Sequence, residues 1–444
     1  MHIPVLSLLG TAAKAAWDKL RGRPTVQAGQ GAIAAGGAQA VTGRVATSGS
    51  VVATDQATVI TGPSGGPTIV VQSGATANFA FHFDGLPSAP SPTRDHFLEG
   101  RRLQEAEHYE EATREFQAAF ADADTEGQRG ALHLLLGISQ SILGRPTQAE
   151  GSFKEARRLL QSVGDGEGEA AALGNLGVVY ANRGELERAE ESHQQALEIN
   201  RKIGNRLGEA NNLGNLGTVY GRRGEMDRAK EHLEPALKID REIGNRLGEA
   251  QDLGNLGNVY FQRRSPGDLD KAEEHHRQAL DIDREIGNRL GEAQDLGNLG
   301  LVYFQRRGPG DLDKAEEHYR QALDIDQAIG NRLGEANQLG NLSLVYASRG
   351  ELDKADEHLK LALGIQRDIG DRLGEAAALG NLGLVYLQRG DLDKAKECLQ
   401  QAQAIYSQIG VEGRGPENVR WALEHIEEHE RQQREGGDEK RSEG

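Results

Sequence analysis

Asparagine side chains recur at a nearly constant interval along the chain. Successive copies are 40 to 43 residues apart, at Asn175, Asn215, Asn255, Asn298, Asn341 and Asn381. A carboxamide carries one acceptor and two donors in one plane, so it can pair with both polar groups of a peptide unit. A row of such side chains could therefore hold the backbone of an extended partner chain. The alternative is that they bond neighbouring helices or face water in a sequence copied by duplication.

Further side chains beside this asparagine row could contribute to binding. Four amides precede row members by four residues, at Asn211, Gln251, Gln294 and Asn337. Phe261 and Phe304 follow row members and could stack on apolar groups of a partner. A glycine always precedes the asparagine, as Gly214 does, and we expect it to leave room for a ligand. Leucines at Leu344 and Leu384 predict that the later copies prefer apolar anchors.

The recurring charged residues do not predict metal or catalytic chemistry. Histidines recur at one equivalent position in four copies, at His232, His275, His318 and His358. Packed helices lie about 8–10 Å apart, whereas zinc ligands must converge to about 2 Å, so we predict no metal site and no cofactor. The sequence also lacks a phosphate-binding loop, a nucleophile elbow and a Cys–His nucleophile arrangement. We therefore predict that the protein is not an enzyme.

A second recurring set consists of arginines at the junctions between copies. They could pair with an acidic ligand, but surface arginines more often pair with Glu or Asp of the adjacent copy. We favour the second interpretation for Arg206, Arg246, Arg289, Arg332 and Arg372.

The elements that position these side chains are helices. The stretch Leu213-Gly-Asn-Leu-Gly217 returns in six copies, and a period of this size indicates a repeat array. Apolar residues Leu213, Leu216, Val219 and Tyr220 have helical spacing, and a second apolar stripe starts at Met226. Gly224 should end the first helix, and Asn245 should cap the next one after Gly244. Gly217 lies in the buried stripe, where it lets the second helix approach closely.

The pattern of each copy resembles the tetratricopeptide (TPR) repeat. That family has large apolar residues at positions 4, 7 and 11 and small residues at positions 8, 20 and 27. The matching residues here are Leu173, Leu176, Tyr180, Gly177, Ala189 and Ala196. The 40-residue period resembles the variant found in kinesin light chains, Pins-type scaffolds and bacterial signalling proteins. Ser343 replaces one position-8 glycine, leucine replaces the usual tryptophan, and the late proline is absent.

The resemblance implies an all-α fold, a right-handed α-α superhelix. We expect eight hairpins over residues 91–412, a capping helix over 413–435 and a disordered tail over 436–444. In TPR solenoids positions 2, 6, 9 and 13 line the concave groove, and the asparagine row occupies position 6. The related scaffolds grip peptides with asparagines at this position, so the resemblance implies peptide binding here. Pro235 falls in the middle of a helix, where we expect a kink.

The first 90 residues have a different composition. Residues 1–22 can form an amphipathic helix. Residues 23–90 are rich in Gly, Ala, Val and Thr and nearly uncharged, with β-prone pieces such as Val51-Val-Ala, Thr58-Val-Ile and Thr68-Ile-Val-Val. This segment is either a self-associating β segment or a linker, and we favour the first because disorder usually comes with charge.

Charge and cysteine content limit the partners. The formal net charge is −17 at pH 7, which disfavours nucleic acid as a ligand. The lone Cys398 provides no disulfide framework, so we expect a cytoplasmic protein. No stretch is predicted to span a membrane. The predicted function is a scaffold that binds a protein or peptide segment. The alternative is a structural protein that assembles into a homo-oligomer through residues 23–90.

Overall fold

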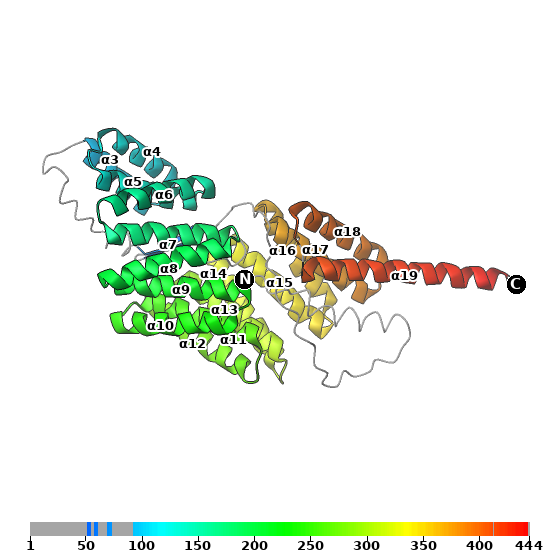
Figure 1. Ribbon diagram of the computed structural model, residues 1–444. Coiled ribbons are helices and arrows are strands. Elements are labelled where there is room, and N and C mark those ends of the chain that lie inside the picture. Colours follow the sequence, from blue (N-terminus) through cyan, green and yellow to red (C-terminus); the bar gives the residue numbers. More distant parts are fainter. Residues whose placement is uncertain (1–50, 55–56, 61–68, 73–91, 412, 443–444) are drawn as a thin grey trace. The chain divides into compact units, whose positions relative to one another are not determined.

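The structure, a computed structural model, describes residues 51–54, 57–60, 69–72, 92–411 and 413–442 (Figure 1). The chain divides into two compact units. The described residues up to Asn298 form the first unit, and those from Leu299 onwards form the second. The predicted helix at 1–22 and most of segment 23–90 lie outside the described residues.

The described part of segment 23–90 consists of three short strands. They are β1 (Val51–Thr54), β2 (Ala57–Ile60) and β3 (Ile69–Gln72). Both pairings are antiparallel in the order β1-β2-β3, with Val51 opposite Ile60 and Ile60 opposite Ile69. Each strand coincides with one of the predicted β-prone pieces, rich in β-branched residues that favour extended backbone.

The helices of the first unit form consecutive hairpins, and we name the first helix of each hairpin A and the second B. The A helices are α3 (Pro92–Glu105), α5 (Glu126–Ile142), α7 (Gly166–Asn182), α9 (Arg206–Arg223) and α11 (Arg246–Arg263). The B helices are α4 (Tyr109–Ala119), α6 (Pro146–Ser162), α8 (Leu186–Ile203), α10 (Met226–Ile243) and α12 (Asp268–Ile286), and a 3₁₀ turn (Phe120–Asp122) follows α4. Each A helix packs on the B helix that follows it, and α4, α6, α8 and α10 each pack on the next A helix (Figure 1). Helices α5, α7, α9 and α11 also contact one another in sequence.

The boundary between the units falls inside α13 (Arg289–Arg306). The second unit continues with α14 (Asp311–Ala328), α15 (Arg332–Arg349), α16 (Leu352–Asp368), α17 (Arg372–Arg389), α18 (Leu392–Ile409) and α19 (Arg414–Ser442). Among the described residues, α3 to α18 follow one another as the eight predicted A–B pairs, which confirms the all-α repeat fold. The last helix, α19, continues past residue 435 into the predicted tail.

The helix ends have the predicted caps. Gly204 ends α8 with a φ of 72°, and Gly224 ends α9 with a φ of 81°. This left-handed conformation favours glycine because it has no Cβ. The side chain of Asn205 caps α9 by accepting a 2.9 Å hydrogen bond from the backbone N–H of Gly208. Helix α10 runs unbroken from Met226 to Ile243 with Pro235 inside it.

Close packing within most A–B pairs depends on a glycine at position 8, which Ser343 replaces in α15. A Cβ on Gly217 would lie 2.5 Å from Leu233, and one on Gly257 would lie 2.6 Å from Nε2 of His276. These distances are shorter than real carbon contacts, so only glycine lets the A and B helices meet here. The core above this contact is apolar, with Leu216, Tyr220 and Leu233 almost completely buried.

Candidate functional site

The asparagine row lies on the A helices. In the first unit Asn175, Asn215, Asn255 and Asn298 sit on α7, α9, α11 and α13, and all four are half-buried. Asn175 donates a 2.9 Å hydrogen bond to the backbone oxygen of Ala171. The carboxamides of Asn215, Asn255 and Asn298 have no hydrogen-bond partner among the residues that the structure describes. Three adjacent A helices of one unit therefore present free amide groups.

The two asparagines of the second unit differ from each other. Asn341 of α15 is half-buried like the earlier members, whereas Asn381 of α17 is only 4% exposed. Oδ1 of Asn381 has no hydrogen-bond partner within the described part of the chain. The first five members are thus accessible from solvent, and the sixth is not.

The other predicted binding residues are less uniform. Asn211 and Gln294 are exposed, and Gln251 and Asn337 are half-buried, so these four amides can be reached from solvent. Phe261 and Phe304 are 5% and 3% exposed, and Phe304 belongs to the apolar core of the second unit. The rings therefore pack inside the protein. Their stacking on a ligand stays a prediction that would require neighbouring side chains to move.

The glycines that precede the asparagines do not uniformly leave room for a ligand. A Cβ on Gly214 would lie 2.9 Å from Oδ1 of Asp252, and one on Gly174 would lie 3.5 Å from Oδ1 of Asn212. The space above these glycines is filled by a polar side chain of the next A helix. In the second unit, by contrast, a Cβ on Gly340 would meet nothing within 4 Å. The predicted open space is therefore wrong for Gly214, whereas at Gly174 an added Cβ would make only an ordinary van der Waals contact.

The polar side chains that fill this space form a row that the sequence analysis missed. It occupies position 3, one residue before the position-4 leucine, in four of the six regular repeats, whereas Ala172 and Ala378 stand there in the other two. Its members are buried: Asn212, Asp252, Asp295 and Gln338. Nδ1 of His193 lies 3.2 Å from Oδ1 of Asn212, and Nδ1 of His276 lies 3.2 Å from Oδ1 of Asp295. At Asn212, Asp295 and Gln338 the row joins an A helix to the preceding B helix, whereas Oδ2 of Asp252 has no hydrogen-bond partner in the described part of the chain.

Burial changes the protonation of these groups. It raises the pKa of Asp252 and Asp295 well above the usual aspartate range. Burial and the nearby Asp295 raise the pKa of Asp283 to about 8. Burial lowers the pKa of His276 to about 3 and that of His193 to about 4, because the charged imidazolium is poorly solvated there. These aspartate and histidine side chains are therefore uncharged near pH 7.

The junction arginines form ion pairs within the array. Arg206 pairs with Glu209 of its own helix at 2.5 Å and with Glu242 of α10, the B helix of the same A–B pair, at 2.8 Å. Every other junction arginine pairs with the glutamate three residues ahead of it, at Glu249, Glu292, Glu335 and Glu375. The arginines thus pair with acidic residues of the array, as we favoured, but within their own A–B pair rather than with the adjacent copy.

The recurring histidines lie against tyrosines and do not converge. Ring centroids are 4.8 Å apart in Tyr220–His232, 5.3 Å in Tyr260–His275, 5.4 Å in Tyr303–His318 and 4.9 Å in Tyr346–His358. The described residues contain no group of three His, Cys, Asp or Glu side chains that could hold a metal ion. Nor does any described helix have the length and apolar character needed to cross a membrane.

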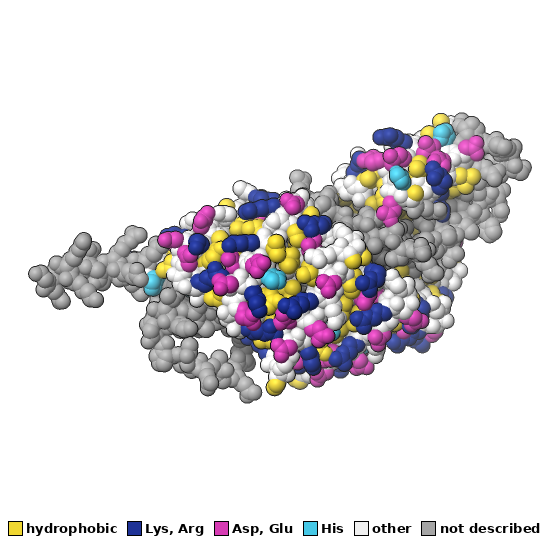
Figure 2. Space-filling model, turned by 180° about the vertical axis from the view of Figure 1, so that it is seen from behind, with side chains coloured by type: hydrophobic (Ala, Val, Ile, Leu, Met, Phe, Trp, Pro, Cys, Tyr) yellow, Lys and Arg dark blue, Asp and Glu magenta, His cyan; other side chains and the backbone are white. Residues whose placement is uncertain are grey.

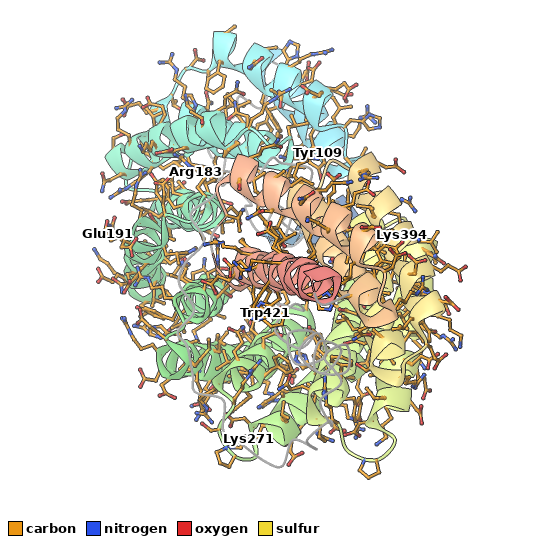
Figure 3. All side chains as sticks on the ribbon, turned by 90° about the vertical axis from the view of Figure 1, so that its right-hand side faces the viewer. Tyr109, Arg183, Glu191, Lys271, Lys394 and Trp421 are labelled. Atoms are coloured by element: carbon orange, nitrogen blue, oxygen red, sulfur yellow. The ribbon has the colours of Figure 1, made fainter. Side chains whose placement is uncertain are left out.

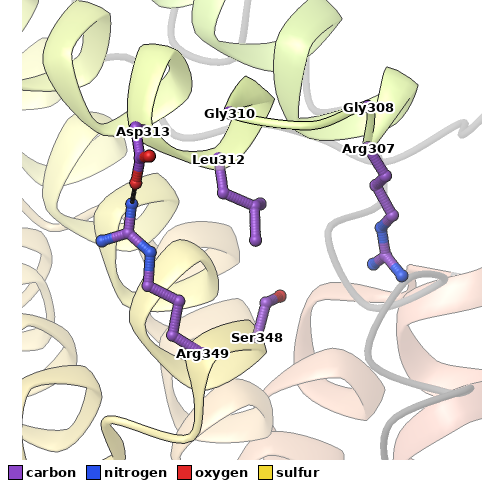
Figure 4. A pocket seen from close by; sticks show the side chains of 7 residues that line it. All are labelled: Arg307, Gly308, Gly310, Leu312, Asp313, Ser348 and Arg349. Carbon is purple, nitrogen blue, oxygen red and sulfur yellow. Dashed lines mark hydrogen bonds and ion pairs between the residues drawn. The ribbon is translucent and has the colours of Figure 1, made fainter.

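One face of the protein carries Lys and Arg side chains interspersed with Asp and Glu, with hydrophobic side chains between them (Figure 2). Glu191 of α8 and Lys271 of α12 point away from the helices (Figure 3). In the second unit a shallow hollow lies at the Gly308-Pro-Gly310 turn between α13 and α14, where Arg349 pairs with Asp313 at 2.5 Å (Figure 4). This hollow brings together no nucleophile and base.

Comparison with known proteins identifies the repeat. The family model described as tetratricopeptide repeat matches residues 128–202, 207–267, 264–328, 307–368 and 334–408, which together exceed half of the chain. No curated protein matches the sequence.

Several solved structures share the fold at low sequence identity. The apo form of RapI is 15% identical with a TM-score of 0.53, covering 63% of this chain and all of RapI. A Rap protein in complex with competence and sporulation factor is 15% identical with a TM-score of 0.50, over 76% of this chain and 98% of that one. A signal transduction ATPase with a tetratricopeptide repeat sensor from Pyrococcus horikoshii is 18% identical with a TM-score of 0.54. The match covers 79% of this chain and 55% of the ATPase. At these identities the likeness establishes the fold alone.

Proposed function

Because the chain belongs to the tetratricopeptide repeat family, we propose that it is a non-enzymatic scaffold that binds an extended peptide segment along its A helices. The binding surface, here named the A-helix face, comprises positions 2, 6, 9 and 13 of α7, α9 and α11, continued by Gln294 and Asn298 of α13. It lies within the first unit.

The observation that carries the proposal is the state of the asparagine amides. Asn215, Asn255 and Asn298 are half-buried and have no partner among the described residues. A partner backbone can satisfy both polar ends of each carboxamide, at about 1 kcal/mol per hydrogen bond. The Rap protein bound to competence and sporulation factor shows that a protein with this fold can hold a ligand, which supports the proposal without identifying the partner.

Geometry sets the expected length of the segment. Neighbouring A helices are about 10 Å apart, so four asparagines extend over about 30 Å. An extended chain rises about 3.3 Å per residue, and the bound segment should therefore have about nine residues in contact with this unit. If the array continues the same way through Asn341 and Asn381, as the sequence predicts, about 15 residues would be needed.

The test combines peptide selection with substitution. Full-length protein is used to select binders from a displayed library of random 12-residue peptides, and their affinities are measured by fluorescence anisotropy. Asn215→Ala with Asn255→Ala should weaken the selected peptides by about ten-fold or more, since each lost amide leaves peptide groups unpaired. The matched control removes two exposed amides elsewhere, by Gln117→Ala with Gln400→Ala. Equal affinities for all three proteins would refute a role of the asparagine row.

A second candidate function is self-assembly. Strands β1 and β3 are the outer strands of the three-stranded sheet in the described part of the first 90 residues. Such edges offer backbone groups to a further strand, for instance from a second copy of the chain. This observation supports the proposal that the N-terminal segment forms a homo-oligomer. We also propose a cytoplasmic location, since the lone Cys398 suits a reducing compartment.

A further inference from the structure

A row of aliphatic side chains is exposed along one edge of the first unit. In α6, α8, α10 and α12 an aliphatic residue directly precedes the left-handed glycine at the end of the B helix. The exposed fraction of this residue lies between 38% and 49% in all four: Val163, Ile203, Ile243 and Ile286. In the described part of the chain six large hydrophobic side chains are exposed, and four of them belong to this aliphatic row. Their concentration on one edge indicates an interaction surface rather than scattered exposure.

The aliphatic row lies where each B helix ends beside the start of its own A helix. A Cβ added to Gly166, at the start of α7, would lie 3.2 Å from Cγ2 of Ile203, at the end of α8. The start of α9 carries Leu207, and the start of α11 carries Leu247. Both leucines are half-buried, so they extend the apolar surface at these hairpin ends.

Charged side chains that flank the aliphatic row pair with one another. Glu242 pairs with Arg206 at 2.8 Å, and Glu285 pairs with Arg246 at 2.5 Å. Both glutamates directly precede a member of the row in the sequence. These ion pairs form a polar rim whose charges already have counter-ions, whereas the aliphatic side chains between them stay exposed to solvent. An occupant of this surface must therefore supply apolar groups.

The spacing of the aliphatic row matches an apolar pattern near the start of the chain. Equivalent positions of successive hairpins are about 10 Å apart, and an α-helix rises by about 10.5 Å over seven residues. In the amphipathic helix predicted for residues 1–22, which lie outside the described residues, Leu6, Ala13 and Leu20 recur at intervals of seven. Leu6 and Leu20 would be about 21 Å apart in such a helix. The three side chains would therefore meet three consecutive hairpin ends.

We propose that residues 1–22 form an amphipathic helix that packs on the aliphatic row of the same chain. This inference does not rest on the proposed function, because no member of the row belongs to the A-helix face. A single helix of this length is only marginally stable in water and needs an apolar surface to pack on. Residues 23–91 connect it to α3 and can extend over about 200 Å, so the chain can reach the row. The docked helix would bridge three A–B pairs that otherwise contact only their neighbours.

The first measurement is hydrogen exchange of residues 1–22 in the full-length protein, followed by mass spectrometry. The row is changed by Ile203→Gln with Ile243→Gln. The matched control is Leu98→Gln with Leu361→Gln, since these leucines are equally exposed on other helices. Residues 1–22 should exchange about ten-fold or more slowly in the natural protein and the control than in the row variant. Equal exchange rates in all three proteins, whether fast or slow, would overturn the inference; circular dichroism verifies that each is folded.

Trp17 provides the second measurement, because it shares a helix face with Ala13 and Leu20. Trp421→Phe leaves Trp17 as the only tryptophan of the full-length chain. Docking should shield Trp17 from quenching by acrylamide, and the row variant in the same background should lose this shielding. Dilution by about 100-fold should not change the shielding, since a contact within one chain does not depend on protein concentration. Shielding that disappears on dilution would show that the helix of a second copy occupies the row, which would overturn the inference.

Discussion

Nδ1 of His276 lies 3.2 Å from Oδ1 of Asp295, and both side chains are almost completely buried. His276 belongs to α12 and Asp295 to α13, so this polar contact connects one A–B pair to the next A helix. Burial raises the pKa of Asp295 and lowers that of His276, so both groups are neutral near pH 7 and share a hydrogen bond. A neutral pair avoids the desolvation cost of a buried ion pair.

The first prediction concerns Asp295 at high pH. Its pKa in the folded protein lies above the unfolded value of about 3.9, so its stabilising contribution is complete below that value and is lost as pH rises through the folded pKa. Asp295→Asn keeps an oxygen acceptor for His276 and cannot ionise. The melting temperature of Asp295→Asn minus that of the natural protein should therefore increase from pH 5 to pH 9, as measured by circular dichroism.

The control for this prediction is Asp281→Asn, because Asp281 is exposed on α12. Its melting temperature should differ from that of the natural protein by the same small amount at each pH. An Asp295→Asn difference that stays constant from pH 5 to pH 9 would show that the buried carboxyl does not titrate in this range.

The second prediction concerns His276 at low pH. Its folded pKa of about 3 lies below the ordinary value of about 6.5. The stability linked to this shift is present above pH 6.5 and is lost as pH falls towards 3. His276→Leu should therefore lose less stability than the natural protein between pH 7 and pH 4. Leu233 and Leu399 already fill the equivalent space beneath Gly217 and Gly383, so leucine fits; equal acid sensitivity of the two proteins would contradict the prediction.

The repeat array could be predicted from the sequence, whereas the buried polar row was missed. Regular apolar spacing and glycine caps determine helix pairs locally, so they can be read without a structure. Asp252 was also detectable, since Asp252, Leu256 and Val259 are spaced i, i+4, i+7 and share one buried stripe. A polar residue on such a stripe usually has a partner. For Asn212 and Asp295 the partner is a histidine of the preceding B helix and depends on how the pairs stack, whereas Oδ2 of Asp252 has no hydrogen-bond partner among the described residues.

Exposure within the candidate site was harder to predict. Position 12 of α11 and α13 adjoins the apolar stripe, so Phe261 and Phe304 could turn towards either the core or the partner. The structure places both rings inside, because burying a large ring is strongly favourable. The space above Gly214 depends on Asp252 of the following helix. Neither contact is encoded within a single repeat.

The third prediction compares two glycines. A Cβ on Gly257 would lie 2.6 Å from Nε2 of His276, so Gly257→Ala should force the helices apart and destabilise by about 1–3 kcal/mol. A Cβ on Gly364, inside α16, would meet nothing within 4 Å. Gly364→Ala should stabilise by about 0.5–1 kcal/mol, because alanine loses less backbone entropy in a helix. Chemical denaturation measures the free energy of unfolding of both variants. An unchanged value for Gly257→Ala would mean that the close contact can relax.

The fourth prediction separates packing from binding on α11. Leu256 is 2% exposed, and Leu256→Ala should destabilise by about 2–5 kcal/mol through the cavity that it leaves. Its neighbour Asn255 is half-buried without a partner in the described part of the chain. Asn255→Ala should leave stability unchanged or raise it by up to about 0.5 kcal/mol, because alanine is the better helix former. Strong destabilisation by Asn255→Ala would show that Asn255 contributes to the stability of the fold rather than to binding.

The last prediction concerns the strands. Each A–B pair packs only on its neighbours, so a chain that starts at Pro92 should remain helical and melt as a folded array. The full-length chain also carries β1, β2 and β3, whose outer strands can pair with another copy. Light scattering should then report a multimer for the full-length protein and a smaller species for the truncated one. If both are monomers, segment 23–90 acts as a linker; if the truncated chain is unfolded by circular dichroism, the sheet belongs to the folded core of the first unit.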